Sequence, residues 1–472
     1  MALVEAQDAA EAKLVRMVLI TLLAAALSSP WPPLAADATA PELDRVDVAP
    51  VWAGHPVGFA ITTGEAFQYV AFYDPRRRMT IAQRRLGATR WVFTPLPTSV
   101  SWDSHNGIAL EVDRSGHLHV SGNMHGDRLI YFRSARPHDI STFERPGMVG
   151  SLEKKVTYPQ FLTASDGTLF FEYRHGKSGS GARIINRYDA ESKTWTRLMS
   201  TPLFDGEGEK SVYLSGPVIG PEGLFHLVWM WRDTPYANTN HDVSYARSRD
   251  LKHWETVGGE RLELPLTPRT MAAIVDPVPT DHGLVGGGFG VGWDARLRPV
   301  ISYLKYGPDG FTQSFNTRWE KGAWIIRQTS SWKYRWNLER TGTLPWNVVA
   351  NPVTVDFQKR LTQSFDHLEA GRGVWILDEE TLRPVARLDE PTFFQRLRQV
   401  TSTFPGMEVR PLIFDRQGEY VLRWETLPIN RDRPRKPPYP PPSMLRVYSV
   451  PFHQEGPEQR PEASGASTLN PD

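Results

Sequence analysis

The sequence predicts an all-β fold, a seven-bladed β-propeller in a single domain, on three observations. Between Val51 and Val450, short segments of alternating apolar and polar residues recur with Gly, Pro, Asp or Asn at their borders, which is typical of strands joined by turns. Helical periodicity is weak throughout, and 390–400 is the one segment for which we expect a short helix. A strand–turn–strand unit recurs roughly every 50–60 residues, so about 400 residues correspond to about seven blades.

The repeated unit begins with a strand, most clearly at 116–122, 167–174 and 223–232, and two of these strands follow an Asp-Gly or Glu-Gly turn at Asp166 and Glu222. A second strand follows at 129–134, 185–189 and 243–248, and two of these lead to a segment with a Trp, 189–198 and 248–257. Further strands are expected at 419–425 and 444–450, and the latter could close the ring by pairing with the first blade. A β-sandwich pair or a β-helix is the alternative architecture.

The two ends of the chain differ from this repeat. Lys13 and Arg16 precede the apolar run 18–27, and Ala36-Asp37-Ala38 offers a cleavage site, so we expect a secretory signal peptide over 1–38. An uncleaved membrane anchor is the alternative, although the run is short for a bilayer. The propeller domain is then expected over 39–453 and a disordered tail over 454–472. Residues 428–442 are Pro-rich and basic, which predicts an extended loop or linker.

Composition limits the partners and the chemistry. The net charge of +1 and the pI of about 8.0 give no reason to expect nucleic acid, although a few Arg in a cleft suffice for an anionic ligand. Cys is absent, which excludes disulfides and thiolate chemistry. The 16 Trp suit either a core or a sugar-binding groove. With the signal removed, we expect a secreted or periplasmic protein with no membrane span, and a monomer.

Four His gather in residues 102–134: His105, His117, His119 and His125. If the strands around 113–116 form an antiparallel hairpin, His105 and His125 lie at the same end of it, where two imidazoles can serve as base and acid. His117 and His119 share one face of a strand and could simply line a blade surface. For the His105 and His125 pair, a structural role and a catalytic role are both open.

Two further clusters contain polar side chains next to strands. Tyr158 begins a strand, and Arg174 ends the next one before the loop GKSGSG; a guanidinium binds carboxylates through forked hydrogen bonds, but it could equally pair with a local acid. The other cluster contains Tyr213, Arg232 and Tyr245. The Arg232 segment WMWRDT could bind a sugar or stack for structural reasons.

Long segments of the chain resemble a known family: SHNGIALEVDRSGHLHVSGNMHGDRLIYFRS, YRHGKSGSG and VWMWRDTPYANTNHDVSYARSRDLKHWE, within residues 95–345. They resemble the BNR-repeat-containing polysaccharide lyases that include the ulvan lyases. The resemblance implies a seven-bladed propeller that cleaves rhamnose–uronate linkages of an ulvan-like acidic polysaccharide by β-elimination. It implies catalytic roles for His105, His125 and Tyr158, and substrate binding by Arg174 and, more loosely, by Tyr213. We add Arg232 and Tyr245 as further substrate-binding candidates.

β-Elimination removes the C5 proton of a uronate and expels the sugar on O4. Arg174 is expected to neutralise the uronate carboxylate, so that charge can develop at C5. His105, His125 and Tyr158 together are expected to supply the base and the acid. A Tyr that acts as base needs a lowered phenol pKa, which Arg174 could provide.

No metal or cofactor is expected to be required for this chemistry. Some members of the family carry a structural zinc held by His and Cys, and with no Cys that site is expected to be absent or altered here. His175, His226 and His241 could be its remnants, but their spacing fits no standard zinc pattern.

Three other functions remain open. A rhamnosyl-glucuronate lyase that acts on a plant or bacterial polymer would share the chemistry. A propeller glycoside hydrolase needs two opposed carboxylic acids, and the sequence shows no Asp/Glu pair that stands out near the His cluster. A non-catalytic carbohydrate-binding propeller would keep the aromatic residues and Arg but would have no use for the His pair.

Overall fold

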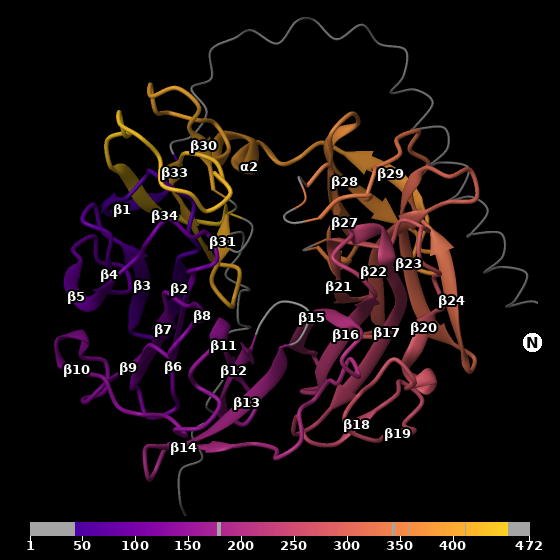
Figure 1. Ribbon diagram of the computed structural model, residues 1–472. Helices are drawn as coiled ribbons and strands as arrows, with labels where there is room; N and C mark the ends of the chain where they lie inside the picture. The colour runs from indigo at the N-terminus through magenta and orange to yellow at the C-terminus, as the bar shows by residue number, and fades with distance from the viewer. Residues whose placement is uncertain are drawn as a thin grey trace, which may run out of the picture. The chain divides into compact units, whose positions relative to one another are not determined.

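The computed structural model describes residues 43–176, 181–341, 344, 346–356, 358–410 and 412–451 (Figure 1). The all-β prediction is confirmed. In these residues the one α-helix is α2 (Thr392–Leu397), inside the segment 390–400 for which a short helix was predicted. The 3-10 helices are η1 (Ile140–Thr142), η2 (Ala237–Thr239) and η3 (Met271–Ala273). The predicted signal segment and tail lie outside the described residues.

The described strands form antiparallel sheets in which most strands pair with their neighbours in the chain. The first sheets in the chain contain β2 (Ala60–Thr63), β3 (Phe67–Tyr73), β4 (Arg78–Arg85) and β5 (Val92–Ser99); then β6 (Ile108–Val112), β7 (Leu118–Gly122), β9 (Tyr131–Ser134) and β10 (Phe143–Glu144); then β8 (His125–Asp127), β11 (Val156–Thr163), β12 (Leu169–His175), β13 (Ala182–Asp189) and β14 (Thr194–Arg197).

The next sheets follow in the same manner. They contain β15 (Ser211–Ile219), β16 (Phe225–Arg232), β17 (Asn240–Ser248), β18 (Trp254–Glu255), β19 (Arg261–Leu262) and β20 (Ile274–Asp276); then β21 (Val285–Trp293), β22 (Pro299–Tyr306), β23 (Thr312–Glu320) and β24 (Ala323–Gln328); then β25 (Val348–Ala350), β26 (Thr354–Val355), β27 (Leu361–His367), β28 (Gly371–Leu377) and β29 (Pro384–Leu388).

A further sheet joins the two ends of the described chain. It contains β1 (Arg45–Val51), β34 (Ser443–Ser449), β32 (Tyr420–Arg423) and β31 (Ile413–Phe414), and a two-stranded ribbon of β30 (Glu408–Val409) and β33 (Glu425–Thr426) accompanies it. The predicted strand at 444–450 is β34, and its partner is β1, with Val46 opposite Val447. A late strand therefore pairs with the first described one, and the seven-bladed propeller stays a prediction.

One turn type recurs in these hairpins. The Asp74 carboxylate accepts the backbone N–H groups of the second and fourth residues that follow it and pairs with the Arg at the fourth position. Asp294 and Asp356 repeat this arrangement. Asp113 accepts the same two N–H groups in the turn between β6 and β7. Such Asx turns satisfy backbone donors that a tight hairpin leaves free.

The aromatic residues fill the core for the most part. Trp229, Trp254, Trp336 and Trp424 are among the largest fully buried side chains. His119 is also buried and contacts the Tyr131 hydroxyl at 2.8 Å and Asp113 at 3.2 Å. These contacts hold His119 inside the core.

Candidate active site

The hairpin of β6 and β7 brings His105 and His125 together, as predicted. Its strands are antiparallel with Ile108 opposite Gly122, so residues just before β6 and just after β7 lie at the same end. The two imidazole rings stack with centres 4.1 Å apart and planes 22° from parallel. His125 is the first residue of the short strand β8 rather than part of a loop.

A single carboxylate holds both rings. Asp103 contacts Nδ1 of His105 through Oδ1 and Nδ1 of His125 through Oδ2, each at 2.7 Å. Burial would raise the pKa of Asp103, but hydrogen bonds from the His105 backbone and from the two imidazoles outweigh burial and lower it. An ionised carboxylate only accepts, so both Nδ1 atoms donate, and Nε2 of each neutral ring is left to accept a proton.

The strand β8 carries His125 into the neighbouring sheet, next to the other candidates. Thr157 of β11 lies opposite His125 of β8 on one side and opposite Arg174 of β12 on the other. The ladder between β11 and β12 then shifts between Thr157 and Gln160, and Tyr158 adopts φ of 56°. A bulge of this kind changes the direction of a side chain, and a left-handed conformation is rare for an aromatic residue.

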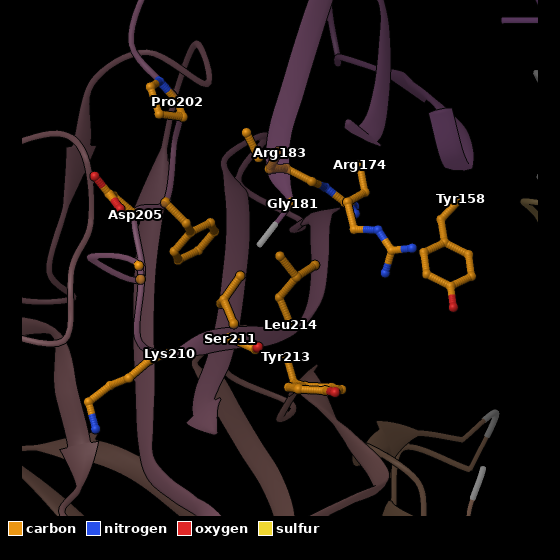
Figure 2. Close-up of a pocket in the computed structure, with 15 residues that line it drawn as sticks. Tyr158, Arg174, Gly181, Arg183, Pro202, Asp205, Lys210, Ser211, Tyr213 and Leu214 are labelled. Atoms are coloured by element: carbon orange, nitrogen blue, oxygen red, sulfur yellow. The ribbon is translucent and has the colours of Figure 1, made fainter. Parts of the chain in front are cut away.

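Tyr158 lies beside both imidazoles and below the cation of Arg174. Its ring centre is 6.0 Å from that of His105 and 6.4 Å from that of His125, and 41% of the residue is exposed. The Arg174 guanidinium carbon lies 5.0 Å from the ring centre, and Figure 2 shows this guanidinium reaching the Tyr158 ring. Burial raises the pKa of Tyr158, and Arg174 offsets burial only in part. Arg174 thus lowers the pKa of this phenol, as expected from the sequence, but desolvation outweighs the cation and the net shift is upward, which disfavours Tyr158 as the base.

Tyr213 and Arg232 form a pair on β15 and β16. Arg232 Nη1 donates to the Tyr213 hydroxyl at 2.8 Å, and Arg232 Nε donates to Asn240 Oδ1 at 2.6 Å. Burial lowers the pKa of Arg232, opposed by Tyr213. The Arg232 guanidinium carbon lies 3.8 Å from the Tyr213 ring centre, and Tyr213 remains 37% exposed.

Tyr158, Arg174 and Tyr213 line one side of a cavity of about 610 Å³ (Figure 2). Lys210 and Arg183 also line it, but each already has an acidic partner, Asp233 for Lys210 and Glu172 for Arg183. Arg174 has no such ion pair among the described residues, and its Nε is a buried atom without a hydrogen-bond partner there. Arg174 is therefore the cavity cation best placed to receive an anionic group.

The structure does not bring Tyr245 to this cluster. The side chain is buried at 1% exposure, and its hydroxyl contacts His226 Nδ1 at 2.7 Å. The spacing of residues along β17 could not distinguish an inward-facing Tyr from one that faces the cavity. A polymer cannot reach this side chain, so the substrate-binding role expected for Tyr245 has no support in the structure.

Two of the three His residues suggested as zinc remnants, His226 and His241, have separate acidic partners. His226 contacts Glu222, and His241 lies between Asp233 and Asp242. Within the described ranges, Asp103, His105 and His125 are the group with metal-ligand atoms close enough to share an ion, within 4.8 Å of one another. Their stacked rings point to separate carboxylate oxygens, an arrangement that suits hydrogen bonding.

Sequence reasoning missed two carboxylates. Asp103 stands two residues before His105, and an Asp-x-His turn was the available local signal. Asp432 comes from the Pro-rich segment 428–442 and accepts hydrogen bonds from the Ser104 N–H and hydroxyl, both at 2.8 Å. Its Oδ2 lies 3.5 Å from Nδ1 of His105. The structure therefore places two carboxylates, Asp103 and Asp432, beside the His pair, where no Asp/Glu pair stood out in the sequence.

The family of the protein follows from the match of residues 67–332, more than half of the chain, to the family described as BNR repeat-containing family member. The chain belongs to this family. In the described residues, no helix is long and apolar enough to cross a membrane.

Curated relatives are ulvan lyases. The short isoform from Alteromonas sp. (strain LOR) is 30% identical over 145 residues, which are 28% of this chain and 27% of the relative. The ulvan lyase of Nonlabens ulvanivorans is 24% identical over 48% of this chain and 55% of its own length. The chain thus matches about half or less of each of these relatives.

Solved structures show the same fold. A PL25 ulvan lyase superposes with a TM-score of 0.58 at 15% identity, covering 86% of this chain and 96% of that one. The polysaccharide lyase Uly1 gives 0.57 at 15% identity, covering 87% and 99%.

Proposed function

We propose that the protein is a polysaccharide lyase that cleaves rhamnose–uronate linkages of an ulvan-like acidic polysaccharide by β-elimination. The observation that carries this proposal is the pairing of His105 and His125 on Asp103 beside the contact of Tyr158 with Arg174. His105 and His125 offer proton acceptors, Tyr158 offers a proton donor, and Arg174 offers a cation next to them. The relatives named ulvan lyases support the proposal, as does a related solved lyase whose bound ligand is -[GlcA(1-4)Rha3S]-.

The roles follow from the protonation states. Arg174 pairs with the uronate carboxylate, which stabilises the charge that develops at C5. Nε2 of His105 or His125 accepts the C5 proton, the electron pair forms the C4–C5 double bond, and the bond from C4 to O4 breaks. Tyr158 keeps its proton because its pKa is raised, so it is the group that donates to O4. Exchange with solvent then returns the proton to Tyr158 and removes the one held by His.

The two carboxylates beside the His pair do not suit a glycoside hydrolase. Hydrolysis needs a carboxylic acid whose raised pKa keeps a proton available. Burial would raise the pKa of both Asp103 and Asp432, but hydrogen bonds and the neighbouring His lower both. Both groups are therefore acceptors. A rhamnosyl-glucuronate lyase on another polymer shares all of the chemistry above and remains the second candidate.

The proposal also covers the location, the oligomeric state, the metal requirement and the fold of the enzyme. We place it outside the cytoplasm, secreted or periplasmic, as a monomer that needs no metal for catalysis. The successive antiparallel sheets are proposed to be seven propeller blades, for which the pairing of β1 with β34 is the supporting contact. Tyr213 and Arg232 are proposed to bind the sugar next to the cleaved bond.

The test is ultraviolet absorbance after mixing the purified protein with ulvan and with other glucuronate–rhamnose polymers. An unsaturated uronate absorbs, whereas a hydrolysis product does not. We expect absorbance to rise with the wild type and with His253→Ala, an exposed His that pairs with Asp250, and to stay flat with His125→Ala. New reducing ends without absorbance would overturn the lyase proposal, and so would an equal rise with His125→Ala.

A further inference from the structure

The segment 428–442 is folded against the body of the protein, although its composition also suggested a linker. It connects β33 to β34, and at its start the Leu427 N–H donates to the Ala53 carbonyl at 2.9 Å. Near its end the Tyr439 ring lies 5.7 Å from Trp102. The second anchor adjoins the site in sequence, since Trp102 precedes Asp103.

Asp432 is the residue by which this segment reaches the His pair. Besides the two hydrogen bonds from Ser104, its Oδ1 lies 3.4 Å from Nε2 of the buried His55. Its Oδ2 faces Nδ1 of His105, on which Asp103 also acts. Asp432 thus contacts Ser104, the His105 ring and the buried His55.

The backbone at this point is strained. Arg431 and Asp432 have φ of 51° and 53°, two consecutive left-handed residues, neither of them Gly. Such conformations persist when surrounding contacts fix them, and they gather at functional sites. Here the Arg433 N–H donates to the Asn430 carbonyl and the Asn430 side chain donates to the Arg433 carbonyl, both at 3.1 Å, which closes a tight turn. This turn presents the Asp432 side chain to Ser104, His105 and His55.

We propose that Asp432 is a positioning residue for catalysis, which holds the Ser104–His105 peptide so that His105 stays stacked on His125 and aligned with Asp103. This inference rests on the proposed lyase function. It makes the C-terminal segment a required part of the site. A displacement of about 1 Å in a reacting group can cost about 100-fold in rate, so loss of this carboxylate should lower kcat far more than it raises KM.

Two variants separate charge from hydrogen bonding. Asp432→Ala removes both, whereas Asp432→Asn keeps an oxygen that can accept from Ser104. We expect kcat to fall about 100-fold in the Ala variant and about 10-fold in the Asn variant, with KM changed by no more than about twofold. The matched control is Asp44→Ala, because Asp44 accepts a hydrogen bond from Ser449 at 2.7 Å on an exposed strand end, and its kcat should equal that of the wild type.

A measurement without substrate makes the test independent of the lyase proposal. The NMR signals of the His105 ring should shift in Asp432→Ala and stay in place in Asp44→Ala, with melting temperatures close to wild type. If the wild type cleaves no polymer, the function fails while a shifted His105 signal still supports the positioning role. If the Ala variant keeps wild-type kcat, or the His105 signals do not move, the inference about Asp432 is wrong.

Discussion

His105 and His125 stack with ring centres 4.1 Å apart and share one carboxylate, Asp103, through their Nδ1 atoms. This sharing fixes both tautomers at once, because an ionised acceptor at Nδ1 leaves Nε2 as the basic nitrogen of each neutral ring. Each of the two rings can therefore accept a proton at its Nε2 atom.

Asp103→Asn should therefore disturb the orientation or tautomer of the two imidazole rings. The amide has a single acceptor oxygen and an NH₂ group that repels an Nδ1–H, so at least one ring must turn or change tautomer. We expect kcat to fall by roughly 100- to 10,000-fold, the range typical of lost general acid–base catalysis. The measurement is the initial rate of absorbance increase with polymer. Asp250→Asn, at an exposed Asp–His contact of 2.7 Å, is the control, and a rate loss as large in that variant would contradict the argument.

Tyr158→Phe should remove the proton donor and keep the ring that contacts Arg174. We expect kcat to fall by roughly 100-fold or more with little change in melting temperature. Because burial raises the pKa of Tyr158 above its usual value of about 10, the wild-type rate should not decline between pH ~8 and pH ~10 through loss of this proton. Tyr236→Phe, at an exposed position, serves as the control. A decline in this range that is absent from the residual rate of Tyr158→Phe would contradict the assignment.

Local patterns were sufficient for the strands and the hairpin. Alternation of apolar and polar residues found β7, β12 and β16, and the turn at 113–116 placed His105 and His125 at one end of their hairpin. These features depend on neighbours in the chain, which the sequence displays directly.

Such local patterns could not predict contacts between segments that are distant in the sequence. The contact of Ser104 with Asp432 joins residues 328 positions apart, and a Pro-rich composition suggests only that a segment is extended. The inward direction of Tyr245 and the bulge at Tyr158 likewise depend on packing and on strand register. The pKa of Tyr158 depended on the balance between burial and one cation, which spacing along the chain cannot supply.

Asp294→Ala should be among the most destabilising changes in a surface turn. Its carboxylate is fully buried and pairs with the fully buried Arg318 at 3.0 Å. Arg318 keeps Glu320 at 2.7 Å as a second partner, so removal of Asp294 breaks one of the two ion pairs of this buried cation, at a cost of about 1.5–3 kcal/mol. Asp356 occupies the same turn type but pairs with the part-exposed Arg360, and Asp356→Ala should cost about 1 kcal/mol. Urea unfolding of both variants measures the difference, and equal losses would contradict this account.

His367→Asn should make stability less sensitive to acid. His367 Nδ1 accepts the N–H groups of Glu369 and Ala370 at 3.1 and 3.0 Å, and burial lowers the pKa of this imidazole despite nearby acidic groups. Below the unfolded value of about 6.5, the unfolded chain binds the extra proton more readily than the folded one, so the free energy of unfolding falls as pH falls. An Asn oxygen can accept the same N–H groups without titrating. Urea unfolding at pH ~7.5 and pH ~5.5 should show a smaller loss for the variant than for the wild type, and an unchanged loss would show that His367 does not contribute to the acid sensitivity.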